Sequence, residues 1–126
     1  MAKILIVDDE PYVRMLLEQT LEDFADRGVL LLTAQNGIEA LDVITKERPD
    51  IVFLDIMMPG MDGFNVCNKV KNELKLNDIY IVMLTAKGQD SDVITARKAG
   101  ADLYMTKPFS YDDIVNKTTE ILKDKL

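Results

Sequence analysis

Five polar side chains of this sequence stand where short apolar runs end, namely Asp8, Asp9, Asp55, Thr85 and Lys107. Carboxylates that lie close together repel one another, so the three acids stay ionised together only if a cation joins them. Mg²⁺ suits such a set because it prefers oxygen ligands, retains several waters and often takes a phosphate as a further ligand. The residue types therefore indicate a magnesium site, provided that the fold brings the ends of these runs together.

Lys107 and Thr85 extend this chemistry to a phosphoryl group. Lys107 supplies a compact positive charge and Thr85 supplies a hydroxyl donor, and with a metal they would neutralise a phosphoryl group in transfer, a reaction governed by positioning and charge stabilisation. The nucleophile would then be a carboxylate, since aspartyl phosphates are known covalent intermediates. The sequence contains no His, which excludes Ser-His-Asp and Cys-His centres and removes the commonest transition-metal ligand.

The elements that must position these residues follow from the hydrophobic pattern. Apolar runs predict strands at 3–7, 29–33, 51–54, 79–84 and 103–105. Helical periodicity predicts helices at 11–26, after Asn36-Gly37, at 64–74, at 89–99 and after Ser110. This alternation predicts a doubly wound α/β fold, (βα)5, with a parallel sheet and helices on both faces. The carboxyl ends of all five strands then share one edge, which is where ligands bind in such sheets.

Length and composition limit the class of protein. The 126 residues fit one domain, 1–126, and a net charge of -7 argues against direct nucleic-acid binding. No apolar run is long enough to cross a membrane, and the start lacks the features of a signal peptide. The single cysteine, Cys67, excludes an internal disulfide and suits a reducing cytosol, so we expect a cytoplasmic protein with Cys67 packed as a small hydrophobe.

Each candidate residue also has an ordinary explanation when it is taken alone. Asp8 and Asp9 could favour a helix N-terminus by their charge, and Asp55 could be a solvated loop acid. Thr85 taken singly fits a loop residue and Lys107 a solvated charge. Their joint occurrence at one predicted sheet edge favours a common site. Further acids are expected to cap helices or face solvent: Asp62, Asp90, Asp92, Asp112 and Asp113.

Four motifs resemble, in this order, the receiver domains of two-component response regulators, including chemotaxis-regulator-like receivers. They are Ile-Leu-Ile-Val-Asp-Asp-Glu, Asp-Ile-Met-Met-Pro-Gly-Met-Asp-Gly, Leu-Thr-Ala and Tyr-Met-Thr-Lys-Pro-Phe. The resemblance covers essentially the whole chain and implies a five-stranded sheet in the flavodoxin-like order 2-1-3-4-5. It implies that Asp55 accepts a phosphoryl group from a phosphohistidine of a sensor histidine kinase or histidine phosphotransfer protein. It also implies that Asp9 binds Mg²⁺ directly and Asp8 largely through water.

The same resemblance assigns roles around the phosphoryl group. Met57 would give a backbone carbonyl to the metal, while Thr85, Lys107 and the backbone N–H of Ala86 would contact the phosphoryl oxygens. In the family the peptide bond corresponding to Lys107–Pro108 is cis and would help to aim the lysine.

A switch is implied as well. Thr85 would move toward the phosphoryl group and Tyr104 would swing inward, which changes the surface of the fourth helix, fifth strand and last helix. Without the resemblance, Tyr104 fits ordinary packing. The downstream partner would be another protein or an output domain, and phosphorylation-dependent dimerisation through this surface is compatible with the family.

Two other functions compete with this interpretation. The first is a Mg²⁺-dependent phosphohydrolase that works through an aspartyl phosphate. Such enzymes place a second acid two residues after the nucleophile, where this chain has Met57, and the predicted loops leave little room for a substrate cap. The second is a phosphorylation-independent interaction module, which the full set of site residues disfavours. Met57 and Lys87 occupy positions that differ widely within the family, and bulky Met57 is expected to hinder water and lengthen the phosphoryl lifetime.

Overall fold

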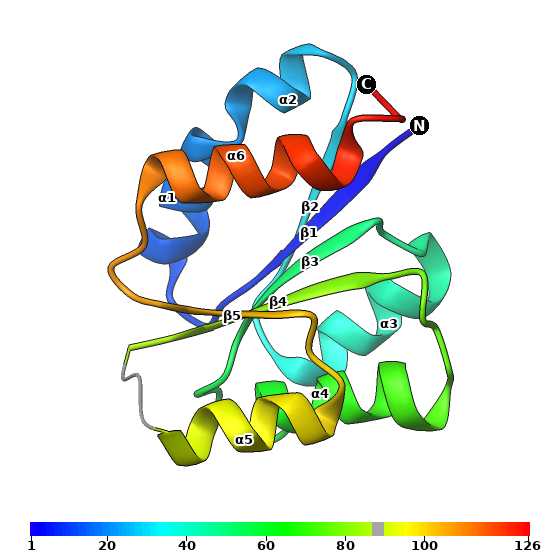
Figure 1. Cartoon of the computed structure of the whole chain (residues 1–126), viewed down its shortest axis with the longest axis vertical. Helices are drawn as coiled ribbons and strands as arrows, with labels where there is room; N and C mark the ends of the chain where they lie inside the picture. Colours follow the sequence, from blue (N-terminus) through cyan, green and yellow to red (C-terminus); the bar gives the residue numbers. More distant parts are fainter. Residues whose placement is uncertain (87–89) are drawn as a thin grey trace.

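A five-stranded parallel sheet forms the centre of the computed structural model, which describes residues 1–86 and 90–126 (Figure 1). The strands are β1 (Lys3–Val7), β2 (Leu30–Ala34), β3 (Ile51–Asp55), β4 (Tyr80–Thr85) and β5 (Leu103–Thr106). They lie in the order β2-β1-β3-β4-β5, and all four neighbouring pairs are parallel. The α/β fold and the strand order 2-1-3-4-5 are therefore confirmed.

Helices cover both faces of this sheet (Figure 1). One face carries α1 (Pro11–Thr20), α2 (Glu22–Asp26) and α6 (Tyr111–Leu122), and the other carries α3 (Gly37–Glu47), α4 (Gly63–Asn68) and α5 (Asp90–Ala99). The side chains of β3 alternate between these layers because strand residues point to opposite faces in turn. Val52 and Leu54 belong to the core under α3–α5, whereas Ile51 and Phe53 belong to the core under α1, α2 and α6. All five residues of β3 are buried.

The single helix expected over 11–26 is in fact two helices. The break falls at Leu21, which has φ -100° and ψ 8° between α1 and α2. The Thr20 hydroxyl donates to the Leu16 carbonyl at 2.8 Å, and the Phe24 amide donates to the Leu21 carbonyl at 3.0 Å. These contacts tighten the chain at the break. Leu21 and Phe24 are both buried in the core, as their helical spacing predicts, but the break between the two helices was not predicted.

The helix expected over 64–74 also departs from regular geometry. After α4 the chain continues as a π-helical turn, η1 (Lys69–Glu73), in which the Leu74 amide donates to the Lys69 carbonyl five residues earlier at 2.8 Å. Asp62 caps α4 as predicted, because its side chain accepts from the Asn65 amide at 2.9 Å.

Further details bear on other expectations. The fourth expected helix begins at Asp90 as far as it is described, and Gln89 and Lys87 lie outside the described residues. Cys67 is buried as expected, and burial raises the pKa of its thiol to about 12. Among the helices that the structure describes, each is too short or too polar to cross a membrane.

Candidate functional site

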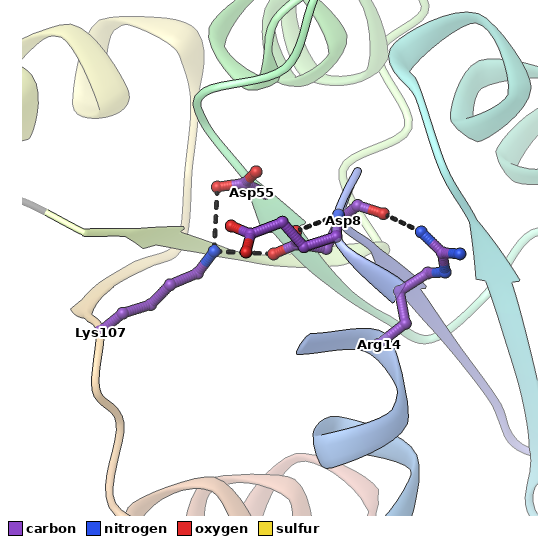
Figure 2. Close-up of polar contacts among 5 residues, drawn as sticks. Asp8, Arg14, Asp55 and Lys107 are labelled. Carbon is purple, nitrogen blue, oxygen red and sulfur yellow. Dashed lines mark hydrogen bonds and ion pairs between the residues drawn. The ribbon is translucent and has the colours of Figure 1, made fainter. Parts of the chain in front are cut away.

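The ends of β1 and β3 bring two of the predicted acids together. These strands pair in parallel with Val7 opposite Leu54, so Asp8 and Asp55 leave the sheet side by side. The Lys107 ammonium lies between them, with Nζ 2.7 Å from Asp8 Oδ2 and 3.2 Å from Asp55 Oδ1 (Figure 2). Lys107 follows β5, two strands away from β3 in the sheet. Residues 99 positions apart in the chain therefore meet at the carboxyl edge, as the alternation of elements predicts.

Asp8 is held at every polar atom. It is fully buried, and its amide donates to the Ala34 carbonyl at 3.2 Å. Its Oδ1 accepts from the Glu10 amide at 2.9 Å while its Oδ2 binds Lys107. Its backbone carbonyl accepts from the Arg14 guanidinium at 2.7 Å (Figure 2). A buried acid with this many partners has one orientation rather than several.

Asp9 and Glu10 continue the acidic cluster into solvent. Both residues are exposed, and carboxylate oxygens of Asp8, Asp9 and Glu10 can lie within 4.8 Å of one another. Sequence reasoning gave Glu10 no role in the site, although it belongs to the same Asp-Asp-Glu motif. Oxygen donors without sulfur or imidazole fit a hard cation, so these residues and Asp55 suit Mg²⁺.

The electrostatics of the buried pair follow from burial and from mutual repulsion. Burial and, after it, the charge of Asp8 raise the pKa of Asp55 to about 6, although Lys107 acts in the opposite direction. Burial lowers the pKa of Lys107, but its bonds to Asp8 and Asp55 outweigh this effect and leave it raised. The carboxylates of the site thus carry more negative charge than the Lys107 ammonium can neutralise. This excess favours the binding of an added cation.

Thr85 ends β4 beside this cluster. It is buried, it pairs in register with Thr106, and its carbonyl accepts from the Lys107 amide at 2.6 Å. Ala86 follows at the exposed end of the strand. The bond between Lys107 and Pro108 is cis. Met57, two residues after Asp55, has a side chain that is 73% exposed. The assignment of the Met57 carbonyl and the Ala86 amide as ligands stays a prediction.

Tyr104 lies on β5, half-buried, next to a cavity. Burial raises the pKa of its hydroxyl, whereas a hydrogen bond with Thr85 lowers it. The cavity has a volume of about 280 Å³ and is lined by Tyr104 together with Val93, Ala96 and Ala101 from α5 and the turn after it. The hydrogen bond between Thr85 and Tyr104 therefore connects the end of β4 to the surface formed by α5 and β5.

Gly63 is a site residue that sequence reasoning missed. A Cβ added at this position would lie 2.4 Å from the Asp55 carbonyl oxygen and 2.9 Å from the Ile56 Cα. The Gly63 amide also donates to the Ile56 carbonyl at 2.9 Å. Only glycine allows the start of α4 to approach the backbone of Asp55 this closely. The available signal was the Asp-Gly pair that ends the Asp-Ile-Met-Met-Pro-Gly-Met-Asp-Gly motif, from which the sequence predicts a cap at Asp62 but no role for Gly63.

Comparison with known proteins places these features in a family. Residues 4–119 match the family model of the response regulator receiver domain. The chain is 42% identical over 121 residues to a probable transcriptional regulator ycf27 of Guillardia theta, and 44% identical over 121 residues to the one of Pyropia yezoensis. These alignments cover 96% of this chain but 45% and 47% of those proteins. The chain thus spans about half the length of the curated relatives it matches.

Solved structures agree with the sequence relatives. The chemotaxis protein CheY4 of Vibrio cholerae superimposes with a TM-score of 0.84 at 31% identity, over 97% of this chain and 99% of that one. The receiver domain of the Francisella response regulator 1452 superimposes with a TM-score of 0.86 at 27% identity, over the whole of both chains.

Proposed function

Because this chain belongs to the response regulator receiver-domain family, we propose that residues 1–126 act as one receiver domain that accepts a phosphoryl group on Asp55. The observation that carries the proposal is the contact of Lys107 with both Asp8 and Asp55 at the carboxyl edge. A nucleophilic carboxylate, a neighbouring acid pair and a fixed cation are the parts that phosphoryl transfer to an aspartate requires.

In the proposed reaction, an Asp55 carboxylate oxygen attacks phosphorus of a phosphohistidine on a sensor histidine kinase or histidine phosphotransfer protein. A new P–O bond forms, the P–N bond breaks, and its electron pair stays on the leaving imidazole, which takes a proton from solvent. Lys107 and the Thr85 hydroxyl would stabilise charge on the phosphoryl oxygens, joined by the Ala86 amide. Asp8, Asp9, Asp55 and the Met57 carbonyl would hold Mg²⁺, which neutralises further charge when bound.

Exposed apolar side chains around the site support a protein as the phosphoryl donor. Tyr12 at the start of α1, Ile38 on α3 and Met57 are each more than half exposed. A cavity of about 530 Å³ beside Asp9 is lined by Ile38 and Met61 among others. Apolar groups gathered at the mouth of a charged site are typical of a surface that another protein covers. A small phosphate ester would gain little from them.

The proposed output is a change in the surface formed by α5, β5 and α6. Phosphorylation would draw Thr85 toward Asp55 and let Tyr104 move into the space beside α5. The phosphorylated state must then bind its partner better than the unphosphorylated state does, or no equilibrium shifts. The partner would be a downstream protein or a second domain of a longer chain, and dimerisation through this surface belongs to the same proposal.

Intact mass after incubation with acetyl phosphate and Mg²⁺ tests this function. We expect one added phosphoryl mass on the wild type, loss of labelling when the metal is chelated, and no labelling of Asp55→Asn. Asp62→Asn is the matched control, because Asp62 caps α4 near the site and should not affect labelling. Rapid release of phosphate over many turnovers would instead support a phosphohydrolase. No labelling of any variant would support a phosphorylation-independent interaction module.

A further inference from the structure

Arg14 reaches the candidate site from α1, on the other side of Asp8 from Lys107 (Figure 2). Its guanidinium NH1 donates to the Asp8 backbone carbonyl at 2.7 Å, a contact that the proposed reaction does not use. We propose that Arg14 is a positioning residue that holds the Asp8–Asp9 pair in the orientation that binds Mg²⁺. This inference rests on the proposed function, because it concerns the metal site of the same reaction.

The start of α1 explains why such a contact is needed. Glu10 is the N-cap residue of α1, and its side chain makes no capping hydrogen bond. Pro11 follows and has no amide hydrogen to contribute. Arg14 closes this turn twice, because its amide donates to the Glu10 carbonyl at 3.2 Å and its side chain donates to the Asp8 carbonyl. The arginine thus ties the first turn of α1 back to the end of β1.

The Asp8 carbonyl controls the direction of the chain into Asp9. The carbonyl of Asp8 and the amide of Asp9 belong to one planar peptide unit, so a hydrogen bond that fixes the carbonyl also fixes that plane. The amide and both carboxylate oxygens of Asp8 already bind Ala34, Glu10 and Lys107, which leaves its carbonyl as the remaining polar group. Asp9 is exposed, and in this proposal the peptide plane that Arg14 holds sets the direction in which the Asp9 side chain leaves the backbone.

Charge and geometry predict opposite effects of removing Arg14. As a nearby cation, Arg14 would repel Mg²⁺, and its removal would tighten metal binding. As a positioning residue, it orients the acids, and its removal would weaken metal binding, as the loss of groups that orient metal ligands does. The sign of the change in Mg²⁺ affinity therefore separates the two roles.

Calorimetric titration with Mg²⁺ alone provides the test. We expect the Mg²⁺ Kd of Arg14→Met to rise about tenfold or more, within the range typical for partners of metal ligands. Arg14→Lys keeps the positive charge but loses the planar guanidinium group. Its Mg²⁺ Kd should therefore lie between those of the wild type and Arg14→Met, about threefold above the wild type. Arg27→Met is the matched control, because Arg27 packs over the Phe24 ring at the end of α2, away from the site.

The outcomes keep this inference separate from the proposed function. Arg14→Met with wild-type or tighter Mg²⁺ binding would overturn the positioning role and leave the proposed function standing, even if the variant melts at a lower temperature. A wild-type chain that binds no Mg²⁺ would overturn both. If Arg14→Met does not fold, the test rests on Arg14→Lys. A Mg²⁺ Kd of Arg14→Lys equal to that of the wild type would overturn the positioning role of Arg14.

Discussion

Replacement of Asp55 by Asn should stabilise the metal-free chain at neutral pH. Asp55 is 4% exposed, and burial together with the charge of Asp8 raises its pKa from 3.8 to about 6. The folded state therefore holds the proton more tightly than the unfolded state does. Such a group lowers stability once pH rises above the unfolded pKa, and the full cost is reached above the folded pKa. Asn cannot ionise, so it avoids this cost.

The size of the effect follows from the same two pKa values. The rise from 3.8 to about 6 corresponds to about 3 kcal/mol of unfolding free energy above pH 7. Water at the mouth of the site screens part of this, so we expect Asp55→Asn to gain about 1–3 kcal/mol at pH 7.5. The gain should shrink as pH falls from about 6 to about 4, because neutral Asp and Asn then carry the same charge.

Urea unfolding at several pH values, with and without Mg²⁺, measures this difference. Without metal, the midpoint for Asp55→Asn should exceed that of the wild type at pH 7.5 and approach it near pH 4.5. Saturating Mg²⁺ should narrow or reverse the gap, because it binds the folded wild type more tightly. Asp42→Asn is the control, because Asp42 lies exposed on α3 beside Lys46. This substitution should change the unfolding free energy by less than about 0.5 kcal/mol. An Asp55→Asn variant that is less stable than the wild type at pH 7.5 without metal would refute this reasoning.

Three further changes probe the site by different means. Gly63→Ala would place a Cβ against the Asp55 carbonyl, so it should cost about 2 kcal/mol in urea unfolding and abolish labelling. Gly28→Ala is the control, because a Cβ there meets no atom within 4 Å and only the φ of +93° is unfavourable; it should lower the unfolding free energy by about 1 kcal/mol and leave labelling intact. Normal labelling of Gly63→Ala would contradict this account. Lys107→Met should slow labelling by acetyl phosphate about 100-fold. It should bind Mg²⁺ in calorimetry at least as tightly as the wild type, because the ammonium group that competes with the metal for the acids is gone. Weaker Mg²⁺ binding would contradict the view that Lys107 and the metal compete. Met57→Ala should shorten the lifetime of the phosphorylated protein several-fold by admitting water, and an unchanged decay of the phosphoryl mass would end that hypothesis.

The positions of the site residues could be predicted because they depend on local signals and on one topological rule. Apolar runs mark the strands, and parallel strands place their carboxyl ends at one edge. Asp8, Asp55 and Lys107 meet there as expected. The order of the strands could not be predicted in this way, because periodicity does not specify which strands are neighbours. The correct order was predicted from the resemblance to receiver domains.

Features that depend on tertiary contacts were beyond the sequence pattern. Hydrophobic periodicity continues through the break at Leu21 and gives no signal of it. It also gives no signal of the hydrogen bond between Arg14 and Asp8, which joins a helix to a strand end. Gly63 was missed because the close backbone approach that requires it exists only in the folded chain.

The position of the phosphoryl group is the most direct test of the account. Borohydride reduces an aspartyl phosphate to homoserine, so reduction of the labelled wild type, followed by peptide sequencing by mass spectrometry, identifies the acceptor. We predict that homoserine appears at position 55 alone and that Asp8 and Asp9 remain unchanged. Homoserine at either of those acids, or a stable phosphate elsewhere with Asp55 intact, would contradict the assignment of Asp55 as the acceptor.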